Sequence, residues 1–380
     1  MRVSATPTQP KPKPASFSLG WTVILSLLVA VLAQPFVALL FSTSATGPAT
    51  MSMARAVSRG IAKKVRSIET AEGAGAVVRR SIGTPALRNI SPFLMLDHFR
   101  ITEGAGFPDH PHRGQITLTY ILEGQSQHED FAGHAGTIGP GDVQWMNAGH
   151  GIMHAEMPIH RDASGNKLPD PVGLQLWVDL PKEAKKEPPS YQEYRSAAIP
   201  TAKVAGDQDE EGFEVKVVVG ESHGVESPIK LPKNGGMTFL DITLDAAGTV
   251  FQKLDPRYNA FIYTLEGMVV VGDSTPVDAP ARAAFGGGTE AVEGEKIEPF
   301  HTLVLTQRGE EGVRIRNAGE GKARLVLVAG EPLDQQVVQY GPFVMTSRNE
   351  IQQTLIDFQT GSNGFERAPG WRSKIGAHMT

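Results

Sequence analysis

Two short motifs carry residue types that bind metal ions: His110-Pro111-His112, and His154-Ala155-Glu156 further along the chain. In a β-strand, residues two apart point to the same face of the sheet, so each motif would present its two donor groups side by side. Two such strands facing each other would enclose three imidazoles and one carboxylate. This donor set suits a divalent first-row metal and leaves coordination positions open for water, dioxygen or substrate.

The surrounding sequence predicts short strands that could position these donors. Residues 116–122 alternate in the manner of a strand and end at the turn Glu123-Gly124. A second Gly-rich turn spans residues 139–142 and precedes another apolar run. We therefore expect a small β-barrel that holds an ion. Eight of the eleven histidines fall in this stretch of about sixty residues: His98, His110, His112, His128, His134, His150, His154 and His160.

Longer motifs around these residues resemble those of the pirin family, whose members are bicupins. The resemblance rests on FPDHPHRG (107–114), YILEG (120–124), HEDF (128–131), PGDVQWM (140–146) and GIMHAEMP (151–158). It continues at RRSIG (79–83), SPFLMLDH (91–98), GLQLWV (173–178), YGPFVM (340–345) and NGFER (363–367), and covers roughly residues 56 to 376. It implies an all-β fold of two tandem, jelly-roll-like cupin β-barrels followed by a short C-terminal helix.

The resemblance also implies a ligand set. In the pirin family the His-x-His and His-x-Glu pairs bind iron, and they match His110, His112, His154 and Glu156 here. We therefore expect one Fe(II) per chain in the N-terminal barrel, a position that other divalent first-row metals could also take. Glu156 would serve both as a ligand and as a catalytic base.

The chain departs from the wider cupin pattern at one place. Cupins commonly carry a Glu three or four residues after the second His, whereas Gln115 and Ile116 stand there in this sequence. The departure changes the pocket lining and the hydrogen bonds that orient the ligand histidines. The candidates for such hydrogen bonds are Asp109, Gln115, Gln144 and His150.

An internal repeat predicts the second barrel. The motif at residues 120–124 is echoed by YTLEG at residues 263–267. Aligning the two copies places Lys253 and Asp255 where His110 and His112 stand, so we expect a second barrel without a metal site. The expected boundaries are a disordered N-terminus (1–16), a hydrophobic segment (17–41), a linker (42–55), the metal-binding cupin (56–185), the C-terminal cupin (200–346), and a helix and tail (347–380), with helical spacing over 349–359.

Chain length, net charge and the absence of cysteine limit the number of domains, the kinds of partner and the kinds of metal site. A chain of 380 residues suits two domains of ordinary size. The net charge of −5 gives no case for direct nucleic-acid binding, which needs a basic face. The absence of cysteine excludes disulfides and thiolate ligands, argues against a structural zinc site, and leaves the metal as the redox-active group. We expect a monomer.

The N-terminus carries a nearly continuous apolar run over residues 17–41, long enough to cross a bilayer as a transmembrane helix. Three interpretations are open: a signal anchor, a cleaved leader, or an extension upstream of a start near Met51. The protein would be membrane-anchored in the first case and cytoplasmic or nuclear in the third.

Two functions follow from the resemblance. The first is a non-haem Fe(II) dioxygenase that acts on a small aromatic substrate, a flavonol such as quercetin. The second is a non-catalytic iron protein, a redox sensor or cofactor that binds a transcription factor, in which the iron changes a binding surface. The dioxygenase is favoured. Its pocket would be walled by aromatic and apolar side chains, for which the candidates are Phe107, Phe131, Trp145 and Met153.

Overall fold

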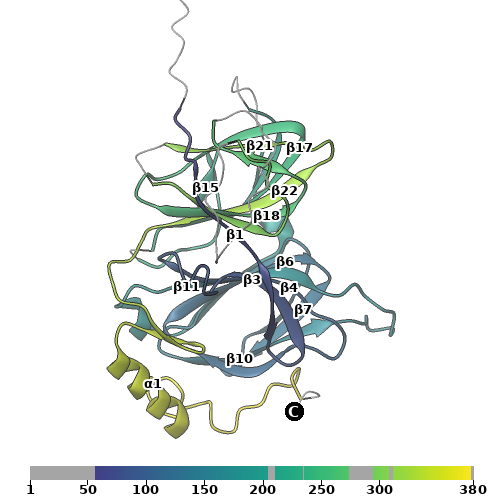
Figure 1. The fold of residues 1–380 in the computed structure, drawn as a ribbon. Helices are drawn as coiled ribbons and strands as arrows, with labels where there is room; N and C mark the ends of the chain where they lie inside the picture. The colour runs from purple at the N-terminus through teal and green to yellow at the C-terminus, as the bar shows by residue number, and fades with distance from the viewer. Residues whose placement is uncertain (1–55, 204–209, 234, 274–293, 308–310, 378–380) are drawn as a thin grey trace, which may run out of the picture. The chain divides into compact units, whose positions relative to one another are not determined.

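The computed structural model of the chain describes residues 56–203, 210–233, 235–273, 294–307 and 311–377. This part of the chain consists mostly of β-strands, with one α-helix near its end, as the sequence predicted (Figure 1). The strands form barrel-like groups of antiparallel sheets, and a hydrophobic core lies between the two largest sheets.

The N-terminal half contributes a seven-stranded and a four-stranded sheet. The larger one has the order β12-β9-β6-β11-β4-β3-β2, and the smaller one has the order β5-β10-β7-β8. The larger sheet contains β2 (Ile68–Glu72), β3 (Ala76–Ile82), β4 (Phe93–Arg100), β6 (Gln115–Glu123), β9 (Val143–Asn147), β11 (Val172–Asp179) and β12 (Ser190–Tyr194); the smaller one contains β5 (Phe107–His112), β7 (Gln125–Asp130), β8 (Ala135–Ile138) and β10 (Ile152–Ile159).

The C-terminal half forms a nine-stranded sheet, whose strands lie above those of the first two sheets in Figure 1. The sheet contains β1 (Ile61–Arg66), β13 (Thr201–Lys203), β14 (Glu211–Val219), β17 (Met237–Lys253), β18 (Asn259–Glu266), β19 (Val269–Val271), β20 (His301–Leu305), β21 (Gly312–Asn317) and β22 (Ala323–Gly330). A small hairpin of β15 (Glu221–Ser222) and β16 (Val225–Glu226) accompanies it, and two 3₁₀ turns occupy Ala184–Lys186 and Ser196–Ala198.

The first described strand joins the nine-stranded sheet, whose other strands lie between residues 201 and 330. β1 pairs antiparallel with β20, Arg66 lying opposite His301, although the expected boundaries put residues 56–185 in the first barrel. The boundaries themselves remain a prediction.

Strand β6 shows how the sequence builds both a core and a site. Its even-numbered side chains Ile116, Leu118 and Tyr120 enter the large core, whereas Gln115 and Thr119 contact the predicted ligands on the other face. Because successive side chains of a strand alternate between the faces of a sheet, one strand serves both purposes. The predicted alternation over residues 116–122 lies within this strand.

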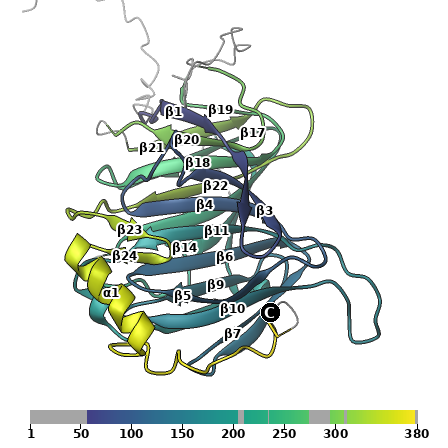
Figure 2. The ribbon, with the colours of Figure 1, turned by 60° about the horizontal axis from the view of Figure 1, so that its bottom comes forward.

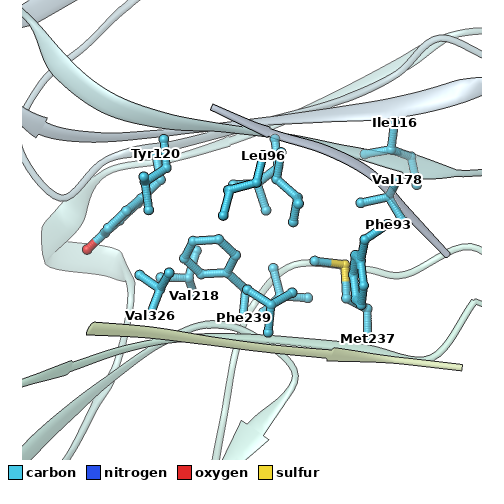
Figure 3. Close-up of a cluster of buried hydrophobic side chains, with 14 of the residues drawn as sticks. Phe93, Leu96, Ile116, Tyr120, Val178, Val218, Met237, Phe239 and Val326 are labelled. Carbon is cyan, nitrogen blue, oxygen red and sulfur yellow. The ribbon is translucent and has the colours of Figure 1, made fainter. Parts of the chain in front are cut away.

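The large core lies between the seven-stranded and the nine-stranded sheets (Figure 3). Phe93 of β4 meets Phe261 of β18 edge to face, with ring centroids 5.2 Å apart. The hydroxyl of Tyr120 donates to Asp241 Oδ2 at 2.7 Å, which satisfies a polar atom in an otherwise apolar layer. This shared core fixes the sheet that carries part of the candidate site.

The end of the chain returns to the first barrel. β23 (Val338–Tyr340) and β24 (Phe343–Met345) form a hairpin, and helix α1 (Arg348–Thr360) follows (Figure 2). The helix begins at Ser347, whose hydroxyl accepts from the Glu350 amide, and ends at Gly361, which has a positive φ of 63°. The helix occupies the region predicted from residues 349–359.

The prediction of a transmembrane helix is corrected. A helix needs about 20 apolar residues to cross a bilayer, and α1 has 13 residues and a polar face. Within the residues that the structure describes, no helix is long and apolar enough to span a membrane. The apolar run 17–41, on which that prediction rested, lies outside the described residues, as do the expected N-terminus 1–16 and most of the linker 42–55.

Candidate metal centre

The two predicted motifs lie on neighbouring antiparallel strands. β5 carries His110 and His112, and β10 carries His154 and Glu156 (Figure 2). His154 lies directly opposite His110, and Ile152 lies opposite His112. The register then shifts, so that Glu156 lies opposite Phe107. Such irregularities commonly re-aim side chains beside active sites.

Three of the four predicted ligands come together. One nitrogen each from His110, His112 and His154 lies within 4.8 Å of the others, and Nε2 of His110 is 2.9 Å from Nε2 of His154. Two nitrogens bound to one ion at about 2.1 Å and at right angles would lie about 3 Å apart. The observed separation therefore fits two imidazoles on a shared ion.

Burial favours the form of histidine that binds metal. His112 and His154 are buried, and burial, followed by the neighbouring His110, lowers the pKa of both well below the usual value. Both rings are therefore neutral near pH 7, as a metal ligand must be. His110 is half-buried, and its Nδ1 lies 2.8 Å from the Pro108 carbonyl, which leaves Nε2 directed at His154.

Glu156 stands beside the cluster without belonging to it in the described part of the chain. Its Oε1 accepts from the Thr119 hydroxyl at 2.9 Å, and its Oε2 accepts from Gln175 Nε2 at 3.2 Å. The carboxylate is buried and held by two neutral donors, so it can act as a fourth donor or as a base.

Gln115, at the departure from the cupin pattern, contacts a predicted ligand. Its amide nitrogen lies 2.8 Å from Nδ1 of His112, and its Oε1 is buried without a hydrogen-bond partner. A metal on Nε2 of His112 requires a proton on Nδ1, and that N–H would donate to Oε1 after a half-turn of the amide, or to the Pro342 carbonyl. The orphaned amide oxygen thus fits a metal-bound His112.

The other residues predicted to orient the ligands do not contact them. Asp109 accepts from the Ser373 amide in the C-terminal tail, and His150 Nδ1 lies 2.9 Å from the Glu187 carbonyl. Gln144 is buried, with an amide nitrogen that has no partner among the described residues. Of the four candidates, Gln115 is the one the structure places against a predicted ligand.

A cavity of about 500 Å³ opens on the histidines. This volume lies within the usual range of small-molecule sites, about 300–1,000 Å³. Its walls combine ligand residues, aromatic rings and a charged group, and they include Gly341 and Pro342 from the C-terminal hairpin. The arrangement can hold a ring-shaped organic molecule next to an ion.

The predicted wall residues divide between cavity and core. Phe107 lines the cavity, whereas Trp145 is buried in the core between the sheets. Met153 and Phe131 pack with the C-terminal segment in a separate apolar cluster. Trp177, which the sequence analysis did not single out, lines the cavity and meets the His112 ring at 90° with centroids 5.2 Å apart.

Several polar residues of the site were also missed by sequence reasoning: Thr119, Gln175, and the charged group of Glu72, Arg80 and Asp97. A signal for Gln175 was available, because it interrupts the apolar strand of residues 172–178. In the second half of the chain, Lys253 ends β17, and the Asp255 carboxylate accepts from the Arg257 amide at 2.9 Å.

Comparison with protein families gives two matches. A family model described as pirin matches residues 75–178, and one described as the pirin C-terminal cupin domain matches residues 239–364. Pirin of Homo sapiens is 43% identical over 320 residues, which are 84% of this chain and 99% of that protein. Pirin-like protein 2 of Arabidopsis thaliana is 44% identical over 321 residues, 84% of this chain and 89% of that protein.

Two solved structures are similar to this one. A quercetin 2,3-dioxygenase from Acinetobacter baumannii has a TM-score of 0.66 and 26% identity, with 81% of this chain and 99% of that chain covered. The protein GK1651 from Geobacillus kaustophilus has a TM-score of 0.58 and 33% identity, with 74% of this chain and all of that chain covered.

Proposed function

Because the chain belongs to the pirin family, we propose that it is a metal-dependent dioxygenase of the two-barrel cupin type that acts on a quercetin-like flavonol. The observation that carries the proposal is the cluster of His110, His112 and His154, of which His110 and His112 line a cavity large enough for a flavonol. The similarity to the quercetin 2,3-dioxygenase of Acinetobacter baumannii supports the substrate class.

The proposed metal is Fe(II), with His110, His112, His154 and Glu156 as ligands. Three imidazoles and a carboxylate suit iron, and they also suit other divalent first-row metals. When bound, iron would supply the redox chemistry towards dioxygen that amino-acid side chains lack.

Glu156 is the proposed base. Its Oε2 would accept the proton of the flavonol 3-hydroxyl, which makes the substrate more electron-rich and easier to oxidise. The Thr119 hydroxyl and the Gln175 amide hold the carboxylate in place before the substrate arrives. This preorganisation removes the need for the base to rotate during proton transfer.

The aromatic lining is proposed to orient the substrate. Phe99, Phe107 and Trp177 line the cavity, and planar rings can stack on aromatic side chains. A flavonol between them would displace water from the reacting carbons. Exclusion of water protects reactive intermediates from side reactions.

The test is oxygen uptake by the iron-loaded chain with and without quercetin, together with the variant Glu156→Gln. We expect uptake that depends on quercetin, and a loss of roughly a hundredfold or more in the variant, because a positioned base typically contributes about 10²–10⁴-fold. Glu123→Gln is the matched control: Glu123 is exposed in the same barrel, with a weak ion pair to Arg100 at 3.8 Å. Iron-loaded wild type that consumes no more oxygen with quercetin than without it would contradict the proposal.

The alternative role, an iron-dependent redox sensor or cofactor for a transcription factor, stays a prediction from the family resemblance.

A further inference from the structure

A charged group lines the cavity away from the histidines. Arg80 of β3 donates from Nε to Asp97 Oδ1 at 2.8 Å and from Nη2 to Asp97 Oδ2 at 2.6 Å. The same Nη2 donates to Glu72 Oε2 at 2.5 Å. All three residues line the cavity that opens on His110 and His112. We call them the Glu72–Arg80–Asp97 group.

Strand pairing sets the distance between this group and the proposed base. Thr119, Gln175, Asp97 and Arg80 are register neighbours on four successive strands of one sheet. Adjacent strands lie about 4.8 Å apart, so the backbones of Gln175 and Arg80 are separated by about 10 Å. Gln175 holds Glu156, so a molecule of two linked ring systems could reach from the base to Arg80.

The group keeps one donor and one acceptor unused. Among the described residues, Arg80 Nη1 and Glu72 Oε1 have no hydrogen-bond partner. A phenolic hydroxyl both donates and accepts, so it could donate to Glu72 Oε1 and accept from Arg80 Nη1. A carboxylate could use the second contact but not the first.

The charge of the Glu72–Arg80–Asp97 group also favours a phenolic hydroxyl over a carboxylate. Two carboxylates around one guanidinium leave the group with a net negative charge, and the Asp97 side chain is 3% exposed. A substrate carboxylate at this place would meet like charge. A neutral hydroxyl on an aromatic ring meets no such penalty.

We propose that Glu72 and Arg80 form a specificity site that recognises a phenolic hydroxyl on the part of the flavonol that lies away from the metal centre, with Asp97 holding Arg80 in position. The inference rests on the proposed function and adds the reason why a polyhydroxylated flavonol would be preferred over a bare one.

The test is equilibrium binding of two flavonols to the iron-loaded full chain without oxygen, followed by flavonol absorbance. Quercetin carries hydroxyls on both ring systems, whereas 3-hydroxyflavone keeps only the hydroxyl next to the carbonyl. We expect wild type to prefer quercetin, and Glu72→Ala to weaken quercetin binding roughly tenfold while 3-hydroxyflavone binding is unchanged, because hydrogen bonds to charged groups contribute on this scale.

The matched control is Glu69→Ala. Glu69 lies on the same strand, is 67% exposed, and forms an ion pair with Arg79 at 2.9 Å outside the cavity. Arg80→Lys is a second variant, which keeps the charge and loses the fork that contacts Asp97. It should also reduce the preference for quercetin.

The outcomes separate this inference from the proposed function. Equal binding of both flavonols to wild type, or equal weakening of both by Glu72→Ala, would overturn the specificity site. Selective binding without oxygen uptake would sustain the specificity site and contradict the dioxygenase proposal. A wild type that binds neither flavonol would overturn both.

Discussion

The contact between Gln115 and His112 makes a sharp prediction about metal affinity. Gln115 is fully buried, and its amide is the side-chain group that touches Nδ1 of His112. Replacing it with Leu keeps a similar volume and removes that group. His112 would then lose a partner that fixes its ring orientation and the position of its proton.

The size of the expected loss in metal affinity depends on the hydrogen-bond acceptors that remain near His112 in the variant. Loss of a group that orients a metal ligand typically costs about 10- to 100-fold in affinity. The Pro342 carbonyl, which accepts from Gln115 Nε2 at 3.4 Å in wild type, would remain beside His112 as an acceptor, so we expect the lower end, about tenfold or 1.4 kcal/mol. Gln115→Glu keeps an acceptor at the same place and should bind metal at least as tightly as wild type.

The assay is competitive Fe(II) titration against a chromophoric chelator under anaerobic conditions. Gln144→Leu is the matched control, because Gln144 is a buried amide in the same barrel that contacts none of the predicted ligands. Affinity in Gln115→Leu equal to that of Gln144→Leu would refute the role given to Gln115.

Three further predictions concern loading and stability. The double variant His110→Ala, His112→Ala should bind no iron but keep its far-ultraviolet circular dichroism; stoichiometric iron in it would contradict the ligand assignment. Arg113→Ala should lower the free energy of unfolding by about 3 kcal/mol in urea, because it leaves Asp357 buried without its partner, the two side chains being 7% and 4% exposed; an unchanged midpoint would contradict this. Burial, with nearby arginine charges, lowers the pKa of His98 to about 4 from 6.5. Between these values the unfolded chain takes up a proton that the folded chain resists, so the folded state loses stability as pH falls. The free energy of unfolding of wild type should therefore fall by up to about 3 kcal/mol more than that of His98→Gln over this range. Parallel pH profiles of the two proteins would contradict this effect of His98.

The sequence predicted the parts of the site that depend on local periodicity. A two-residue repeat is a property of every strand, so His110 and His112 had to share a face once β5 formed. The pairing of His154 with His110 joins residues 44 positions apart. The motifs gave that pairing only on the condition that their two strands face each other, and the family resemblance supplied the ligand set.

The sequence could not predict contacts between distant elements. Pro342 reaches the Gln115 amide across 227 positions, because the C-terminal hairpin returns to the first barrel after the second is complete. The pairing of β1 with β20 in the nine-stranded sheet is another such contact. Thr119 and Arg80 lie in one line across the sheet because four strands are hydrogen-bonded in a particular order. The alternation of residues within a single strand gives no information about that order.

The fate of dioxygen in the reaction of the iron-loaded chain with quercetin decides whether the metal centre is that of a dioxygenase. With heavy-isotope dioxygen, we expect that equal numbers of oxygen and quercetin molecules are consumed and that both heavy atoms appear in the product by mass spectrometry. We expect no reaction in the metal-free chain. Oxygen consumption without incorporation, or equal rates with and without iron, would contradict a metal-centred dioxygenase.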